Sequence, residues 1–289
     1  FWWQAYEQKL QAAAAQGIRW VSFFDPEYPV GLFDLDENSG TAPLGIWIQG
    51  TWARSAVLLS VVGSRNPVQG IPLWMKAELQ PNAQTPWTLV SGGAFGVDLW
   101  AHEICLAQQK PTVVVLPSGI SNPYPRDWSR SRSRVLDSGG CFISEYEGGM
   151  PIMKFHFHAR NRLIAAISPV TVVLQAARKS GTWMTANWAE QLSRKIAVLP
   201  GPAWDRRFDG SYDLIRANNV MVTSRNEVAA LVPMLFKCDR ANNQKEHVRE
   251  PHGDNGRDSA LSGQGFSGDV ESPIDNDKSD SHNKAAGFS

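Results

Sequence analysis

Short apolar runs alternate with amphipathic stretches through the middle of this chain. The runs are rich in Val, Ile and Leu and are nearly continuous, which is typical of parallel strands that are buried on both faces. They lie at residues 56–63, 87–93, 112–119, 141–146, 170–176 and 195–201. Helix-like stretches separate most of them, at residues 96–109, 160–168 and 184–195. The alternation predicts an α/β fold with a Rossmann-like, doubly wound, mostly parallel sheet.

The two ends of the chain follow other patterns. Residues 3–16 predict a helix that ends at Gly17, and extended segments rich in Pro and Gly follow it. After Phe236 the chain is dominated by Asn, Asp, Ser and Gly and cannot bury enough apolar surface to fold alone. We therefore expect a short N-terminal extension at 1–51, at most a remnant of a helical domain, a Rossmann-like domain at 52–236 and a disordered tail at 237–289.

The net charge of zero hides an uneven distribution. Residues 52–236 carry nineteen basic and twelve acidic side chains (+7), residues 1–51 carry two and six (−4), and residues 237–289 carry seven and ten (−3). A positive centre between acidic ends favours a polyanionic partner for the centre. This excess of positive charge is modest, so an ordinary protein surface without a polyanionic partner remains the alternative.

Several classes of protein are disfavoured by composition. The three cysteines, Cys105, Cys141 and Cys238, form no C-x-x-C pair, which argues against a disulfide framework and fits a reducing compartment. No apolar run approaches the ~18 residues of a membrane span, and the first residues do not resemble a secretory signal. His156 and His158 have no third metal ligand at a recognisable spacing. We therefore predict a cytoplasmic protein with no membrane partner, no metal and no cofactor.

Small residues follow most of the predicted strands. In a doubly wound sheet, ligands bind beyond the carboxyl ends of the strands, and loops that open onto helix N-termini attract anions. The small residues are Gly63-Ser64, Ser91-Gly92-Gly93 with Gly96, Ser118-Gly119, Ser180-Gly181-Thr182 and Gly201. Turns favour Gly and Ser anyway, so one such loop proves little. Together they predict a phosphate-binding rim.

The known nucleotide and hydrolase motifs are missing. The chain has neither G-x-G-x-x-G with a following acid nor a P-loop, which disfavours a dinucleotide dehydrogenase and a P-loop ATPase. No G-x-S-x-G elbow surrounds Ser91 or Ser180, so a serine hydrolase is disfavoured. Asp98 and His102 lie four residues apart on a predicted helix. They could form a catalytic acid/base pair, or they could make a local contact within the helix.

Residues 153–168 combine cations with aromatic rings. Lys154, Arg160 and Arg162 are interleaved with Phe155 and Phe157. Cations that follow a phosphate backbone and rings that stack on bases suit single-stranded nucleic acid. The alternative is structural: the Phe rings belong to the core, and the two arginines cap helices or pair with acids.

A series of motifs resembles a known family. "VVGSR", "LVSGGAFGVDLWAH", "VVVLPSGISNPYP", "FISEY", "FHFHARNRLIAAIS", "SGTWMTANWA", "VLPGP" and "GSYDLIRANN" occur in order. Together they resemble the DNA-processing protein A (DprA/Smf) family over roughly residues 17–232. The resemblance implies a homodimer that binds single-stranded DNA in a basic pocket and hands it to the RecA recombinase during natural transformation. It implies no enzymatic turnover.

The resemblance also assigns site residues and marks departures. The DNA- or phosphate-binding residues that it implies are Gly63, Ser64, Arg65, Ser91, Gly92, Gly93, Gly96, Lys154, Phe157, Arg160, Asn161, Arg162, Ser180, Gly181 and Thr182. No catalytic or metal-binding residue is implied. This chain differs from the usual family residue at Gln69, Phe95, His158, Gln175 and Asn218-Asn219. Phe95 and Gln175 are expected near the pocket. The tail stands where many members carry a winged-helix domain.

Two other functions remain as alternatives. Phosphoribohydrolases of the lysine-decarboxylase-like (LOG) type share a related fold and carry P-G-G-x-G-T-x-x-E. Here the stretch "KSGTWMTANWAE" lacks the double Gly, and Glu190 comes too late. A nucleotide-sensing protein is the other alternative, and its pocket should close around a single nucleotide.

Overall fold

The computed structural model of the chain describes residues 2–35, 41–52, 57–79, 87–217, 219–224, 226–227 and 230. These residues belong to one compact unit. The expected tail at 237–289 and the departure at Asn218 lie outside them. None of the helices in the described ranges is both long enough and apolar enough to cross a membrane.

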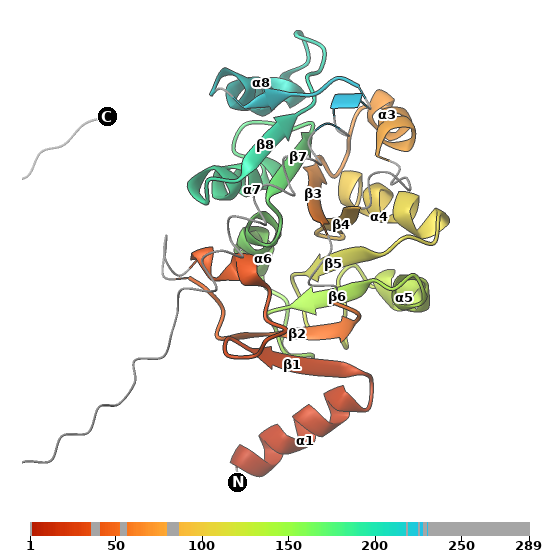
Figure 1. Ribbon diagram of the computed structural model, residues 1–289, viewed down its shortest axis with the longest axis vertical. Helices are drawn as coiled ribbons and strands as arrows, with labels where there is room; N and C mark the ends of the chain where they lie inside the picture. Colours follow the sequence, from red (N-terminus) through yellow and green to blue (C-terminus); the bar gives the residue numbers. More distant parts are fainter. Residues whose placement is uncertain are drawn as a thin grey trace, which may run out of the picture. The chain divides into compact units, whose positions relative to one another are not determined.

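A nine-stranded sheet forms the centre of the described residues (Figure 1). Its strands are β1 Ile18–Ser22, β2 Gly45–Gly50, β3 Val57–Gly63, β4 Trp87–Ser91, β5 Thr112–Leu116, β6 Cys141–Ser144, β7 Val170–Leu174, β8 Lys195–Val198 and β9 Val220–Met221. They lie in the order β1-β2-β6-β5-β4-β3-β7-β8-β9. All neighbours from β6 to β9 are parallel, whereas β1 and β2 are antiparallel to their neighbours. The predicted mostly parallel α/β fold is confirmed.

The N-terminal extension joins this sheet. Helix α1 (Trp2–Ala14) forms where the sequence predicts it. The extended chain after it becomes β1 and β2, and β2 pairs with β6 in the register Trp47 to Ser144. The boundary expected at residue 52 therefore does not separate two folded parts, because strands from both sides of it pair in one sheet.

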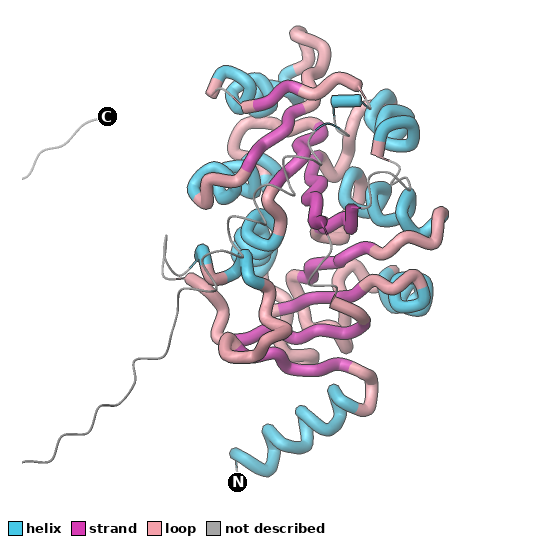
Figure 2. Tube along the Cα trace, in the orientation of Figure 1, coloured by secondary structure: helices cyan, strands magenta, loops and turns pink. Residues whose placement is uncertain are grey.

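Helices cover both faces of the sheet, as the layers in Figure 2 show. Helices α3 (Gly70–Glu78), α4 (Val97–Ala107) and α5 (Trp128–Asp137) lie on one face. Helices α6 (Lys154–Ile167), α7 (Gly181–Gln191) and α8 (Asp209–Arg216) lie on the other (Figure 1). Two short 3-10 turns are η1 (Val30–Leu32) and η2 (Arg206–Phe208).

Strand β3 shows why the central runs are apolar at nearly every position. Leu58 and Val62 pack into the cluster that contains Ile164 of α6, whereas Leu59 and Val61 pack into the cluster that contains Ala101 of α4. Because helices cover both faces, neither set of alternate side chains can be polar without the loss of buried apolar area.

The strand order reverses between β3 and β7. The chain leaves β3 toward α3 on one face, and it leaves β7 toward α7 on the opposite face. The two loops therefore diverge and leave a crevice between them at the carboxyl ends of the strands, which is where doubly wound sheets bind their ligands.

Candidate nucleic-acid interface

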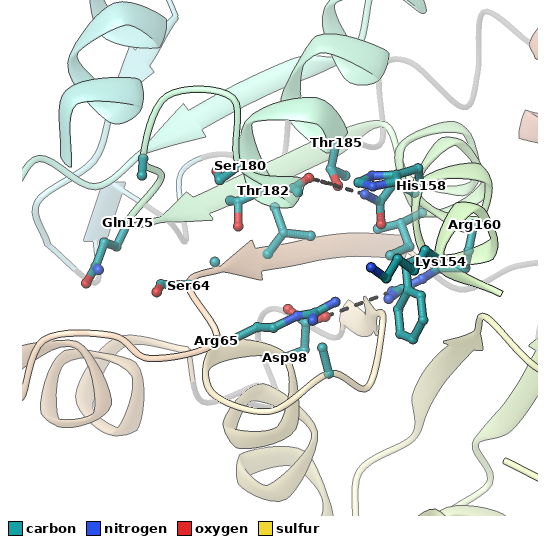
Figure 3. A pocket seen from close by; sticks show the side chains of 18 of the residues that line it. Ser64, Arg65, Asp98, Lys154, His158, Arg160, Gln175, Ser180, Thr182 and Thr185 are labelled. Atoms are coloured by element: carbon teal, nitrogen blue, oxygen red, sulfur yellow. Dashed lines mark hydrogen bonds and ion pairs between the residues drawn. The ribbon is translucent and has the colours of Figure 1, made fainter. Parts of the chain in front are cut away.

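A cavity of about 640 Å³ opens at this point of reversal. The segments that line it include the end of β3, the start of α4, the length of α6 and the loop from β7 into α7. The predicted site residues that line it are Gly63, Ser64, Arg65, Lys154, Phe157, Arg160, Asn161, Ser180, Gly181 and Thr182. Ser180 and Thr182 face Arg65 across the end of β3 (Figure 3).

Five other predicted site residues do not line this cavity. They are Ser91, Gly92, Gly93, Gly96 and Arg162. Ser91 is fully buried, and its hydroxyl donates to the carbonyl of Val61 at 2.6 Å, which ties β4 to β3. Gly92 lines a smaller slot next to the cavity.

The glycines of the β4–α4 loop are required by protein contacts. A Cβ on Gly92 would lie 1.2 Å from Nη1 of Arg160, so only glycine lets that guanidinium cross the loop. Gly96 has φ +81°, and a Cβ there would lie 2.5 Å from the carbonyl oxygen of Ser64. Close packing within the protein thus accounts for these glycines, and their predicted contact with a phosphate stays a prediction. Gly181 differs, because its nearest neighbour would be Nδ2 of Asn161 at 3.9 Å.

The N-terminus of α7 forms one wall of the cavity. Ser180 is the N-cap, and its hydroxyl accepts a hydrogen bond from the Trp183 N–H at 3.2 Å. The Asn161 amide and the Thr185 hydroxyl both donate to the Gly181 carbonyl, at 3.2 and 3.1 Å. The other first-turn N–H groups have no intrahelical acceptor, and the helix dipole adds positive potential. This end of α7 is suited to an anion.

Two exposed cations and an aromatic ring form the opposite side. The Arg65 guanidinium carbon lies 5.3 Å from the centroid of the Phe157 ring, within the range of a cation–π contact. Tyr124 meets Phe157 edge to face, with centroids 5.4 Å apart. Within the described part of the chain, neither Arg65 nor Lys154 forms an ion pair. Their charges are therefore available to a bound anion.

Arg160 is a buried cation with unsatisfied hydrogen-bond donors among the described residues. The residue is 3 % exposed, and its Nε and Nη1 have no hydrogen-bond partner among the described residues. Oδ2 of Asp98 lies 3.9 Å from Nη1 (Figure 3). Burial lowers the pKa of Arg160 to about 10 against the opposing effect of Asp98, and burial raises the pKa of Asp98. Arg160 is therefore still charged at neutral pH, with donors that a ligand oxygen could satisfy.

Arg162 is held elsewhere. Its guanidinium makes two hydrogen bonds to Glu145, at 2.8 and 2.6 Å, and its Nε donates to the carbonyl of Thr41 at 3.0 Å. The structural alternative, in which an arginine of this segment pairs with an acid, describes Arg162 well.

The histidines have structural contacts. His102 is fully buried, its Nδ1 lies 2.7 Å from the Thr112 hydroxyl, and burial lowers its pKa to about 3. The Thr112 hydroxyl donates to the Leu89 carbonyl, so it accepts from Nδ1 of a neutral His102. His156 stacks on Tyr146 at 4.0 Å. Among the described residues, no group of three His, Cys, Asp or Glu side chains could hold a metal.

The cavity is also lined by residues that were not among the predicted DNA-binding residues. They include Tyr124, His158, Gln175 and Arg207. Gln175, one of the expected departures, accepts a hydrogen bond from the Val68 N–H at 2.8 Å and so fixes the loop after β3. The family resemblance predicts Gln175 near the pocket, and its place in the cavity lining agrees. Arg207 belongs to η2, beyond β8, which no motif marks.

The fold and this cavity define a Rossmann-like protein with a basic site at its switch point. The family model described as "DNA recombination-mediator protein A" matches residues 19–233. The chain belongs to this family, which confirms the resemblance.

Individual relatives agree. The putative DNA processing protein DprA of Mycobacterium tuberculosis (strain H37Rv) is 32 % identical over 234 residues, which cover 77 % of this chain and 60 % of that protein. Protein Smf of Escherichia coli (strain K12) is 32 % identical over 170 residues, 59 % of this chain and 46 % of that protein. This chain thus spans about half to three-fifths of the length of these curated relatives.

Solved structures share the fold. DNA processing protein A of Streptococcus pneumoniae superposes with a TM-score of 0.66 at 28 % identity, over 78 % of this chain and 80 % of that one. A Helicobacter pylori structure, described for its single-stranded DNA binding mode, gives a TM-score of 0.64 at 23 % identity, over 74 % and 96 % of the two chains.

Proposed function

We propose that this protein binds single-stranded DNA in the cavity between β3 and β7, protects it and passes it to RecA during natural transformation. One observation carries the proposal: Arg160 is buried, its Nε and Nη1 have no hydrogen-bond partner among the described residues, and it faces the same cavity as Arg65, Lys154 and the N-terminus of α7. Four sources of positive potential that converge on one cavity favour a phosphate-bearing ligand.

The aromatic ring beside these groups favours a single strand over a duplex. Phe157 is half-buried and lies under Arg65, so a base could stack on the ring while its phosphate meets the cation. A base inside a duplex is already stacked on its neighbours and does not offer a free face. Stacking tolerates any base, so we expect little sequence dependence.

The partners and the lack of turnover are part of the same proposal. We also propose that RecA is the recipient, that a homodimer is the acting form and that the protein is cytoplasmic. The family description as a recombination mediator supports a recombinase as the recipient. The phosphoribohydrolase alternative gains little support, because Glu190 is not among the residues that line the cavity. Asp98, the carboxylate that does line it, faces Arg160.

A binding titration tests the proposal. Fluorescence anisotropy with a labelled oligothymidine and with a duplex of equal length, over a series of salt concentrations, should show preference for the single strand. The log affinity should fall with log salt with a slope of about −0.7 per phosphate neutralised. Arg65→Ala should weaken binding to all sequences alike and reduce the slope by about one phosphate's worth.

The matched control is Lys110→Ala. Lys110 is exposed and precedes β5, so it lies at the opposite edge of the sheet from the cavity. Its removal should leave binding nearly unchanged. Equal affinity for duplex and single strand, or a wild-type affinity that does not change with salt concentration, would refute the proposal.

A further inference from the structure

Phe95 is held at the rim of the DNA site by the geometry of its loop. It is 50 % exposed, between Gly93 and Gly96, whose φ angles are +66° and +81°. The Gly93 carbonyl accepts from the Trp128 indole at 2.9 Å, and the Ala94 carbonyl accepts from the Leu99 N–H at 3.0 Å. After Phe95, the Gly96 carbonyl accepts from the Trp100 N–H at 3.0 Å. The backbone on both sides of Phe95 is thus fixed by hydrogen bonds, and its ring is kept at the surface.

The ring belongs to a slot that continues the main cavity. Phe95, Tyr124 and Phe157 supply the aromatic lining of this slot, and Arg65 and Arg160 supply its charges. All of these except Phe95 also line the main cavity, so the two spaces adjoin. The slot holds about 20 Å³, which is room for a water molecule and not for a nucleobase. Its rings therefore offer a surface and not a pocket.

The chemistry of this surface fits a nucleotide. Among the described residues that line the slot, there are two arginines and no carboxylate. An apolar side chain of a protein partner could cover the rings, but it would leave the Arg65 guanidinium without a counter-charge and the Nε and Nη1 donors of Arg160 without an acceptor. A nucleic-acid strand brings a base for the rings and a phosphate for the cations together.

We propose that Phe95, with Tyr124, forms a second stacking surface, so that a single strand leaves the main cavity over the β4–α4 loop with one further base on these rings. This inference rests on the proposed function. It adds a contact on the path of the strand and predicts that affinity rises by a step when the oligonucleotide is long enough to reach the loop.

The test is a cycle between a protein variant and a modified strand. Phe95→Ala should weaken binding of an oligothymidine roughly five- to 150-fold, which corresponds to the ~1–3 kcal/mol measured for stacked bases. The loss should persist at high salt, because stacking releases no counterions. With a strand that carries abasic sites, the same variant should lose much less. Phe95→Trp should retain binding.

Phe24→Ala is the matched control, since Phe24 is 92 % exposed and does not line the cavity or the slot. Thermal unfolding of each variant, measured alongside, separates lost binding from lost stability. If Phe95→Ala binds like wild type while Arg65→Ala is weakened, the inference is wrong and the proposed function stands. An equal loss on abasic and normal strands would also overturn it. If the wild-type protein does not bind single-stranded DNA, the proposed function fails and the inference fails with it.

Discussion

A single added methyl group at Gly181 tests whether a phosphate meets the N-terminus of α7. Gly181 is the first residue of the helix, is exposed and lines the cavity. An added Cβ would have Asn161 Nδ2 as its nearest neighbour at 3.9 Å, an ordinary van der Waals contact. The substitution Gly181→Ala therefore places a methyl group in the ligand's space without displacing any protein atom.

The expected effects on stability and on binding have opposite signs. Replacing Gly by Ala at a compatible position reduces the entropy of the unfolded chain and stabilises by about 0.4–1 kcal/mol. A phosphate kept away from the first-turn N–H groups loses at least one hydrogen bond to a charged group, about 1.5–3 kcal/mol. That corresponds to a roughly ten- to 150-fold weaker Kd for single-stranded DNA.

Denaturant unfolding and an anisotropy titration on the same protein measure both effects. Gly70→Ala is the control, because Gly70 begins α3, has no atom within 4 Å of an added Cβ and does not line the cavity. It should leave DNA affinity unchanged. If Gly181→Ala binds DNA as tightly as wild type while remaining folded, no phosphate approaches this end of α7 and our anion-site argument is incorrect.

Two further predictions concern groups outside the DNA contact. Arg162→Ala should destabilise the fold by about 1–3 kcal/mol, because Glu145 and the Thr41 carbonyl lose their donor. The folded variant should bind DNA normally. A loss of DNA affinity at unchanged stability would show that Arg162 contacts the DNA. Burial lowers the pKa of His102 from 6.5 to about 3. Below pH 6.5 the unfolded chain therefore binds a proton at this histidine, whereas the native state does not. The free energy of unfolding consequently falls as the pH falls from 6.5 toward 3. His102→Gln should lose this part of the pH dependence in urea titrations, and an unaltered slope would show that His102 does not cause it. The raised pKa of Asp98 acts in the opposite direction, so the comparison with the variant isolates the histidine.

The fold class follows directly from the sequence pattern. A strand covered on both faces must be apolar at nearly every position, so runs such as residues 57–63 and 170–174 can hardly be anything else. The carboxyl ends of parallel strands share one edge, which is why Ser64, Arg65 and Ser180 could be predicted to meet. The pairing of β2 with β6 could not be predicted, because nothing local specifies which distant strand an extended segment will join.

The roles of Arg160 and Arg162 show what only the tertiary structure decided. Two positions along an α-helix differ by about 200°, so the two arginines leave α6 on opposite flanks. The sequence places both arginines in a basic, aromatic segment, but it does not determine which residues each side of the helix contacts. In the folded protein one flank faces Asp98 and the cavity, and the other faces Glu145. Similarly, "SGGAFG" predicts a tight loop from the sequence alone. The reason for glycine at position 92 is that the guanidinium of Arg160, 68 residues further along the chain, occupies the space of a Cβ. Local periodicity records which side chains share a surface, and only the packing of distant segments determines what that surface touches.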